Sequence, residues 1–173
     1  MNFRKVQKLV TAALFTAIIC VATVVVQIPS PVTGFFNLGD CFVLIAAWFL
    51  GMGYGAVAAG FGSALADIIL GYTIYAPATF LIKALMAFTA VLICKAIKNK
   101  PFISKAVSAV TAESIMVLGY FAYEGIILKY GLGAAAAIPT NIMQGIVAIF
   151  AATALAGAME KSKSLTSILK GRK

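Results

Sequence analysis

Six apolar runs, separated by short clusters of turn-forming residues, cover nearly the whole chain. They span residues 8–27, 38–50, 54–70, 76–96, 103–126 and 136–158. Segments such as IPSPVTG and GMG interrupt them, because proline and glycine end helices or turn the backbone. A bilayer core of about 30 Å needs roughly 20 apolar residues per helix, so the run 38–50 is short. The pattern predicts an all-α integral-membrane protein with six transmembrane helices, and one domain over residues 1–173.

The overall composition points to the same class. Hydrophobic residues make up 62% of the 173 residues and charged residues 11%, whereas soluble domains carry about 25% charged residues. A basic N-terminus followed by an apolar stretch is also how a signal peptide begins. Here the stretch runs for about 18 residues or more, longer than a signal-peptide core of about 7 to 15. We therefore expect a retained first helix.

The basic residues fall into three patches. A net charge of +9 would suit a nucleic-acid partner, but with six spans all three patches fall on one side of the membrane and only Lys129 on the other. The positive-inside rule then places both termini in the cytoplasm, and we expect no nucleic-acid partner. The patches are Arg4, Lys5 and Lys8; Lys95, Lys98, Lys100 and Lys105; and Lys161, Lys163, Lys170, Arg172 and Lys173.

Five ionisable side chains interrupt the apolar runs: Asp40, Asp67, Lys83, Glu113 and Glu124. Such charges cost about 2.5 to 3.5 kcal/mol on insertion scales and face a protein interior or a wet cavity. Asp67 and Lys83 flank the short GYTIYA turn, so on antiparallel helices their depths differ by about one turn. A salt bridge between them is feasible. Glu113 alone falls close to the middle of the membrane.

Polar and aromatic residues gather in the outer half of the predicted bundle, whereas the inner half is nearly bare of them. Apolar and aromatic walls with a few polar groups are typical of a ligand pocket, here open to the outside. Alternatively, the tyrosines form an interfacial aromatic belt, Asp67 with Lys83 is a structural pair, and Glu113 is a buried hydrogen-bonded or protonated carboxyl. The outer residues, besides the carboxylates and Lys83, are Tyr72, Tyr75, Tyr120, Asn141 and Gln144.

Small residues recur at helical spacing in two runs. Residues 51–66 are rich in glycine and alanine, and Ala13 and Ala17 lie four apart in the first run. Such spacing lets helix backbones approach closely in lipid. For the third run we expect packing within the chain. For Ala13 and Ala17, internal packing and docking of a partner subunit remain equally open.

The sequence lacks the residues that several kinds of catalytic and binding site require. There is no GxxxxGK[ST] segment for nucleotide phosphates and no histidine for metal sites, catalytic triads or proton switching. We expect no enzymatic activity, no metal site and no cofactor. Uphill transport by such a chain would take its energy from partner subunits or an ion gradient.

Two segments resemble a known family. They are GFFNLGDCFVLIAAWFLGMGYGAVAAGFGSALADIILGYTIYAPATFLIKALMAF, residues 34–88, and GYFAYEGIILKYGLGAAAAIPTNIMQGIVA, residues 119–148. Both are similar to the S components of energy-coupling factor (ECF) transporters, in the riboflavin-type branch. The resemblance implies a substrate-capture subunit in the prokaryotic cell membrane that binds a small water-soluble vitamin from outside. It also implies a coupling subunit and two ATPases as partners, with ATP used by the ATPases alone.

The resemblance also implies site residues. Ala13 and Ala17 match the face that contacts the coupling subunit, and the loaded subunit would topple in the membrane to deliver its ligand. Riboflavin fits the branch, and pyridoxine or a hydroxymethylpyrimidine-type precursor fits as well. The YFAYE and IPTNIMQ patterns lean toward these smaller rings. The candidate substrate-binding residues, with Asp67 added from the charge pattern, are Asn37, Asp40, Asp67, Tyr75, Lys83, Tyr120, Glu124, Asn141 and Gln144.

Two other functions compete with this one. A stand-alone ion-coupled carrier would use Asp67, Glu113 or Glu124 to couple solute to an ion gradient. A non-transporting membrane scaffold would keep its role after Lys83 and Glu124 are neutralised.

Overall fold

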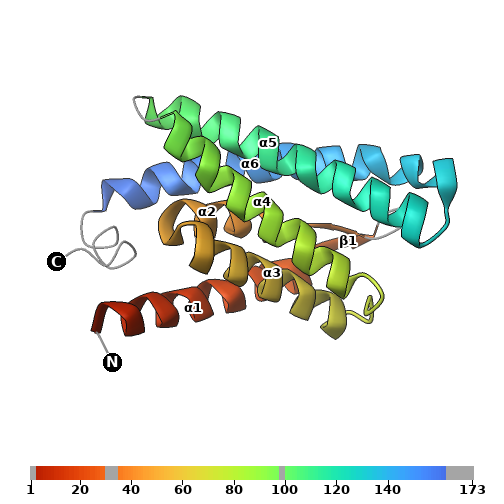
Figure 1. The fold of residues 1–173 in the computed structure, drawn as a ribbon, viewed down its shortest axis with the longest axis horizontal. Helices are drawn as coiled ribbons and strands as arrows, with labels where there is room; N and C mark the ends of the chain where they lie inside the picture. Colours follow the sequence, from red (N-terminus) through yellow and green to blue (C-terminus); the bar gives the residue numbers. More distant parts are fainter. Residues whose placement is uncertain (1–2, 30–34, 98–99, 163–173) are drawn as a thin grey trace.

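A computed structural model describes residues 3–29, 35–97 and 100–162 of the chain. Six α-helices form most of this part of the protein (Figure 1). Each apolar run corresponds to one helix, so the all-α prediction is confirmed. The helices are α1 Phe3–Val25, α2 Gly39–Leu50, α3 Met52–Ile69, α4 Ala76–Ala96, α5 Pro101–Ala122 and α6 Ile138–Lys161.

Proline and glycine set several helix boundaries. Pro77, Pro101 and Pro139 lie at the starts of α4, α5 and α6, where the fixed φ suits the helix and the missing N–H breaks no hydrogen bond. Gly51 alone separates α2 from α3 and has φ 79°. This left-handed value favours glycine, which has no Cβ. The predicted GMG turn is therefore made by one residue.

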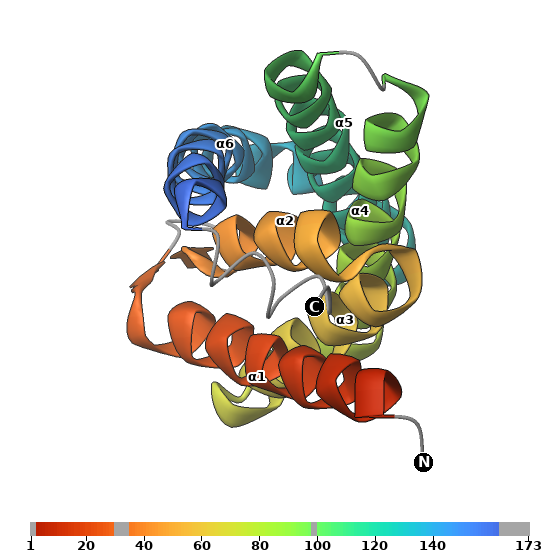
Figure 2. The ribbon, with the colours of Figure 1, turned by 90° about the vertical axis from the view of Figure 1, so that its left-hand side faces the viewer.

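The short helix α2 lies at the centre of the bundle. It contacts α1, α3, α4, α5 and α6, and Figure 2 shows it between α1 on one side and α5 and α6 on the other. Its 12 residues rise about 18 Å, less than the roughly 30 Å of a bilayer core. The other five helices have the length and hydropathy of membrane spans. Six spans with both termini inside stays a prediction.

A two-stranded antiparallel sheet links α1 to α2. Strand β1, Gln27–Pro29, pairs with β2, Phe35–Asn37, and Ile28 lies opposite Phe36. The sequence predicted only a loop here, because three-residue strands are too short to show an alternating pattern. The pairing fixes Phe35 and Asn37 above the start of α2.

The small residues of α3 pack within the chain, as the sequence predicted. A Cβ at Gly62 would lie 2.7 Å from the carbonyl oxygen of Thr16 and 2.8 Å from Cβ of Ile19, both on α1. A Cβ at Gly60 would lie 2.8 Å from the ring of Phe80 on α4. The absence of side chains at these positions lets α3 approach both neighbours closely.

We expect Gly62→Ala to lower stability by about 1 to 3 kcal/mol, because the added methyl group must push α1 away from α3. The measurement is the thermal unfolding midpoint of the purified protein in detergent. Gly53→Ala is the matched control, because it lies in the same helix and a methyl group there would have nothing within 4 Å of it. Equal midpoints for the two variants would contradict the close α1–α3 contact.

The described lysines of the three basic patches lie at one end of the bundle, on the left of Figure 1. Lys8, Lys95, Lys105 and Glu160 line one depression there, and Lys105 Nζ lies 2.6 Å from Glu160 Oε2. This end is the one that the charge pattern predicts to face the cytoplasm. Lys98, Lys163, Lys170, Arg172 and Lys173 lie outside the described residues.

Candidate functional site

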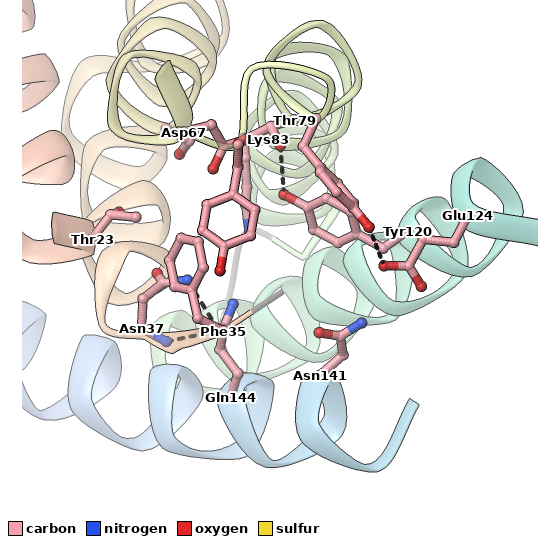
Figure 3. Close-up of a pocket in the computed structure, with 13 residues that line it drawn as sticks. Thr23, Phe35, Asn37, Asp67, Thr79, Lys83, Tyr120, Glu124, Asn141 and Gln144 are labelled. Atoms are coloured by element: carbon pink, nitrogen blue, oxygen red, sulfur yellow. Dashed lines mark hydrogen bonds between the residues drawn. The ribbon is translucent and has the colours of Figure 1, made fainter. Parts of the chain in front are cut away.

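A cavity opens at the end of the bundle opposite the basic end. It lies among the outer parts of α1, α3, α4, α5 and α6, strand β2 and the π-helix η1, Tyr123–Ile127. Its volume is about 60 Å³, below the range of about 300 to 1,000 Å³ for small-molecule sites, so a ring-sized ligand must displace side chains of the lining to enter. The lining residues, most of them labelled in Figure 3, are Thr23, Phe35, Asn37, Ser63, Asp67, Tyr72, Tyr75, Thr79, Lys83, Tyr120, Glu124, Asn141 and Gln144.

A chain of hydrogen bonds forms the floor of the cavity. The backbone N–H and the side-chain Nδ2 of Asn37 donate to Gln144 Oε1, at 2.9 and 3.1 Å (Figure 3). Gln144 Nε2 donates to Asp40 Oδ2 at 2.6 Å, and Lys83 Nζ donates to Asp40 Oδ1. All four side chains are buried. Buried polar groups are costly unless they are paired, so this network holds β2, α2, α4 and α6 in one arrangement.

The sequence Asn37-Leu38-Gly39-Asp40 shapes the start of α2. The Oδ1 atom of Asn37 accepts a hydrogen bond from the N–H of Gly39 at 2.8 Å. A Cβ at Gly39 would lie 2.1 Å from Oγ1 of Thr23, so no side chain fits there. Asp40 lies in the first turn of α2, where the helix dipole favours a negative charge.

The salt bridge that the helix depths allow between Asp67 and Lys83 does not form. Lys83 pairs with Asp40 instead, and both side chains are at most 4% exposed. The prediction compared depths on the two helices joined by the GYTIYA turn. It did not take account of α2, whose central position brings its first turn beneath Lys83.

The ring of Tyr120 lies next to Lys83. Lys83 Nζ is 5.4 Å from the ring centroid, close enough for a cation–π attraction. The Tyr120 hydroxyl is 3.0 Å from Thr79 Oγ1, and the two share a hydrogen bond. Lys83 is thus held by Asp40 below and by an aromatic ring beside it.

Aromatic rings form one wall of the cavity. The centroids of Phe35 and Tyr72 are 5.2 Å apart, those of Tyr72 and Tyr75 are 6.3 Å apart, and those of Tyr75 and Tyr123 are 5.7 Å apart. These spacings are typical of favourable tilted and edge-to-face pairs. Tyr72, Tyr75 and Tyr120 all line the cavity, which favours the pocket interpretation over an interfacial belt.

Glu124 enters the cavity from a π-helix. The sequence predicted a regular helix up to residue 126, but the last turn is η1, and π-turns are frequent at functional sites. Glu124 is 3% exposed, and its Oε1 accepts a hydrogen bond from the Tyr75 hydroxyl at 3.3 Å. Burial and the nearby Glu124 charge raise the pKa of Tyr75 above its ordinary value. Tyr75 therefore keeps its proton and donates.

Glu113 lies apart from the cavity. It is 4% exposed, and neither carboxyl oxygen has a hydrogen-bond partner within the part of the chain that the structure describes. Gly145 makes room for it, since a Cβ there would lie 3.1 Å from Glu113 Cβ. Helical spacing over eleven residues brings Glu113 and Glu124 to nearly the same face of the helix, but Glu113 lines a separate apolar hollow between α5 and α6. Eleven residues put them about 16 Å apart along the axis.

Eight of the nine predicted binding residues line the cavity; the ninth, Asp40, lies beneath it as the partner of Lys83. The list of candidate binding residues left out five lining residues, of which the sequence placed Tyr72 in the outer polar and aromatic group. Thr79 and Ser63 could have been predicted from their spacing. Thr79 precedes Lys83 by four residues and Ser63 precedes Asp67 by four, which places each pair on one helix face. The residues left out are Thr23, Phe35, Ser63, Tyr72 and Thr79.

Ala13 and Ala17 face outward from α1. Both are exposed, whereas Ala12, Phe15 and Ile19 point into the bundle and are buried. Internal packing therefore does not use the Ala13 and Ala17 face, and the alternative of a docking face for a partner remains.

Residues 3–161 match the family model described as the ECF-type riboflavin transporter, S component. The chain belongs to this family. It is also 33% identical, over 76% of its own length and 86% of the other protein's, to an uncharacterized protein in the gap 3′ region of Pyrococcus woesei. A solved structure of the S component of a bacterial ECF transporter has the same fold, with a TM-score of 0.75 at 23% identity over 91% of this chain and 97% of that one.

As an S component, the chain is the substrate-capture subunit of an ECF transporter and not an enzyme. The family works with a coupling subunit and ATPases, so the energy for transport comes from outside this chain. That assignment favours the first of the three functions considered from the sequence over a stand-alone carrier or a scaffold.

Proposed function

We propose that this S component binds a small water-soluble vitamin or vitamin precursor with a flat ring, and that the cavity is its binding site. The carrying observation is the combination of an aromatic wall, built from Phe35, Tyr72 and Tyr75, with a buried floor of paired polar groups. Flat heterocycles stack on such rings, and fixed polar groups orient them. Riboflavin, pyridoxine and hydroxymethylpyrimidine are the candidates.

The proposal extends to delivery. The cavity opens at the end opposite the three basic patches, and the positive-inside rule favours this end facing the outside of a prokaryotic cell membrane. The exposed face of Ala13 and Ala17 would contact the ECF coupling subunit, since small residues allow close helix approach in lipid. Two ATPases bound to that subunit would hydrolyse ATP, and the loaded S component would topple to release its ligand inward.

Two measurements test this function. The purified chain should bind at least one of riboflavin, pyridoxine and hydroxymethylpyrimidine, measured by isothermal titration in detergent. An affinity-tagged copy expressed in its native host should co-purify with a coupling subunit and ATPases. Failure of both experiments would rule the proposal out.

A variant of a lining residue tests whether the ligand binds in the cavity. Tyr72→Ala should weaken binding of the identified vitamin by roughly 10-fold or more, because a stacked aromatic ring contributes about 1 to 3 kcal/mol. Tyr54→Ala is the control, because Tyr54 is absent from the cavity wall. Equal affinities for the two variants would place the ligand elsewhere.

A further inference from the structure

The cavity wall carries more negative than positive groups. Its lining contains two carboxylates, Asp67 from α3 and Glu124 from η1, and Lys83 is the one cation among the described lining residues. Lys83 is already paired with Asp40 beneath the floor, and its side chain is only 4% exposed. The Asp40–Lys83 pair is neutral as a unit, so the charge that a ligand meets is that of the carboxylates.

Asp67 is the carboxylate with room for a new partner. It is 6% exposed, and its Oδ2 atom has no hydrogen-bond partner in residues 3–29, 35–97 and 100–162. Glu124, in contrast, accepts the hydroxyl of Tyr75. Figure 3 shows Asp67 and Glu124 on opposite sides of the lining group. A buried acceptor without a donor is costly, so a ligand that donates to Asp67 would relieve that cost.

The rings beside Asp67 favour the same kind of ligand. Tyr72 and Tyr75 lie edge to face, and Phe35 lies against Tyr72. Aromatic faces attract cations as well as stacking on flat rings. An anionic group, such as a phosphate ester, would find no unpaired cation among the described lining residues.

We propose that the ligand is a small flat ring that carries a positive charge, as an alkylammonium substituent or a protonated amino-heterocycle, and that Asp67 pairs with this charge. The proposal rests on the proposed function, since it names the chemical class of the captured vitamin. It separates such a ligand from riboflavin, whose ring system and side chain are neutral.

The test compares ligands that share a ring and differ in the group that carries the positive charge or allows the ring to take it up. Pyridoxamine and pyridoxine share one ring and differ by an ammonium in place of a hydroxyl group. The aminopyrimidine 4-amino-5-hydroxymethyl-2-methylpyrimidine and its 4-oxo analogue form a second such pair. In competition titrations on the full-length wild type, we expect the cationic member to bind about 10- to 100-fold more tightly in at least one pair. Pyridoxine 5′-phosphate should not compete.

Variants of the protein test whether Asp67 is the group that pairs with the positive charge of the ligand. Asp67→Asn should bring the ratio within the preferred pair close to one while the neutral member still binds. Glu160→Gln, which removes a carboxylate at the opposite end of the bundle, should leave the ratio unchanged. If Asp67→Asn does not fold, Asp67→Glu replaces it and should change the ratio while keeping the preference for the cation.

The outcomes separate this inference from the function itself. Equal or tighter binding of the neutral members, or of riboflavin, by the wild type would overturn the inference and leave vitamin capture intact. A ratio lost in Glu124→Gln and kept in Asp67→Asn would overturn the role of Asp67. Absence of binding by every probe, together with absence of a co-purifying coupling subunit, would overturn the proposed function instead.

Discussion

Replacing Ala17 with tryptophan is expected to lower the initial rate of uptake roughly tenfold or more. Ligand binding by the isolated subunit should stay unchanged. Ala17 and Ala13 are exposed on one face of α1, and the buried face of that helix uses other residues, among them Phe15 and Ile19. An indole on this face blocks close approach of a partner helix without disturbing the bundle. Ala13→Trp should behave in the same way. The measurement pairs vitamin uptake in cells with titration of the purified protein.

Ala154→Trp on α6 is the matched control, because it makes the same substitution at another exposed alanine. It should leave both uptake and binding near the wild-type values. Loss of binding in Ala17→Trp would show that the α1 face supports the fold. Normal uptake in Ala17→Trp and Ala13→Trp would remove this face from the contact with the coupling subunit.

Lys83→Met is expected to lower stability by about 3 to 5 kcal/mol, because it leaves Asp40 buried and without its ionic partner. Asp40 is fully buried, and Gln144 would still donate a hydrogen bond to it but bring no positive charge. Removing both charges should recover most of the loss, since a neutral pair of similar size carries no uncompensated charge. We therefore expect Asp40→Asn with Lys83→Met to unfold close to the wild-type temperature in detergent.

Lys105→Met provides the comparison for this ion pair. Lys105 pairs with Glu160, whose side chain is 40% exposed, and exposed pairs contribute about 0 to 1 kcal/mol. Its unfolding temperature should change little. The double variant at positions 40 and 83 could prove as unstable as Lys83→Met alone. In that case the loss of stability comes from lost packing of the lysine side chain and not from the unpaired charge of Asp40.

Helix positions and the end at which polar groups gather were predictable from sequence. Apolar runs are long and Pro77, Pro101 and Pro139 mark helix starts, so local rules are enough to place the elements. The basic patches and the outer polar residues are also patterns of position along helices. Depth in the membrane follows from them by counting residues at about 1.5 Å each.

Partners across the bundle were not predictable in the same way. Asp40 and Lys83 are 43 residues apart in the chain, and helical periodicity gives the face of a side chain but not which neighbouring helix meets it. Asp67 is nearer to Lys83 in sequence than Asp40 is, and depth alone made a pair with Asp67 feasible. The π-turn at Glu124 and the short β1–β2 pair were not predicted either, because each depends on packing against other elements more than on local sequence.

The uneven distribution of lysines along the bundle limits how the subunit can turn in a membrane. The described helix ends that are predicted to face the cytoplasm carry Lys5, Lys8, Lys95, Lys100, Lys105 and Lys161, whereas the cavity end exposes Lys129. Carrying one lysine to the centre of the bilayer costs about 2.5 to 3.5 kcal/mol on insertion scales. Reorientation that swings the cavity end through lipid therefore moves one such charge, and the basic end is the natural pivot.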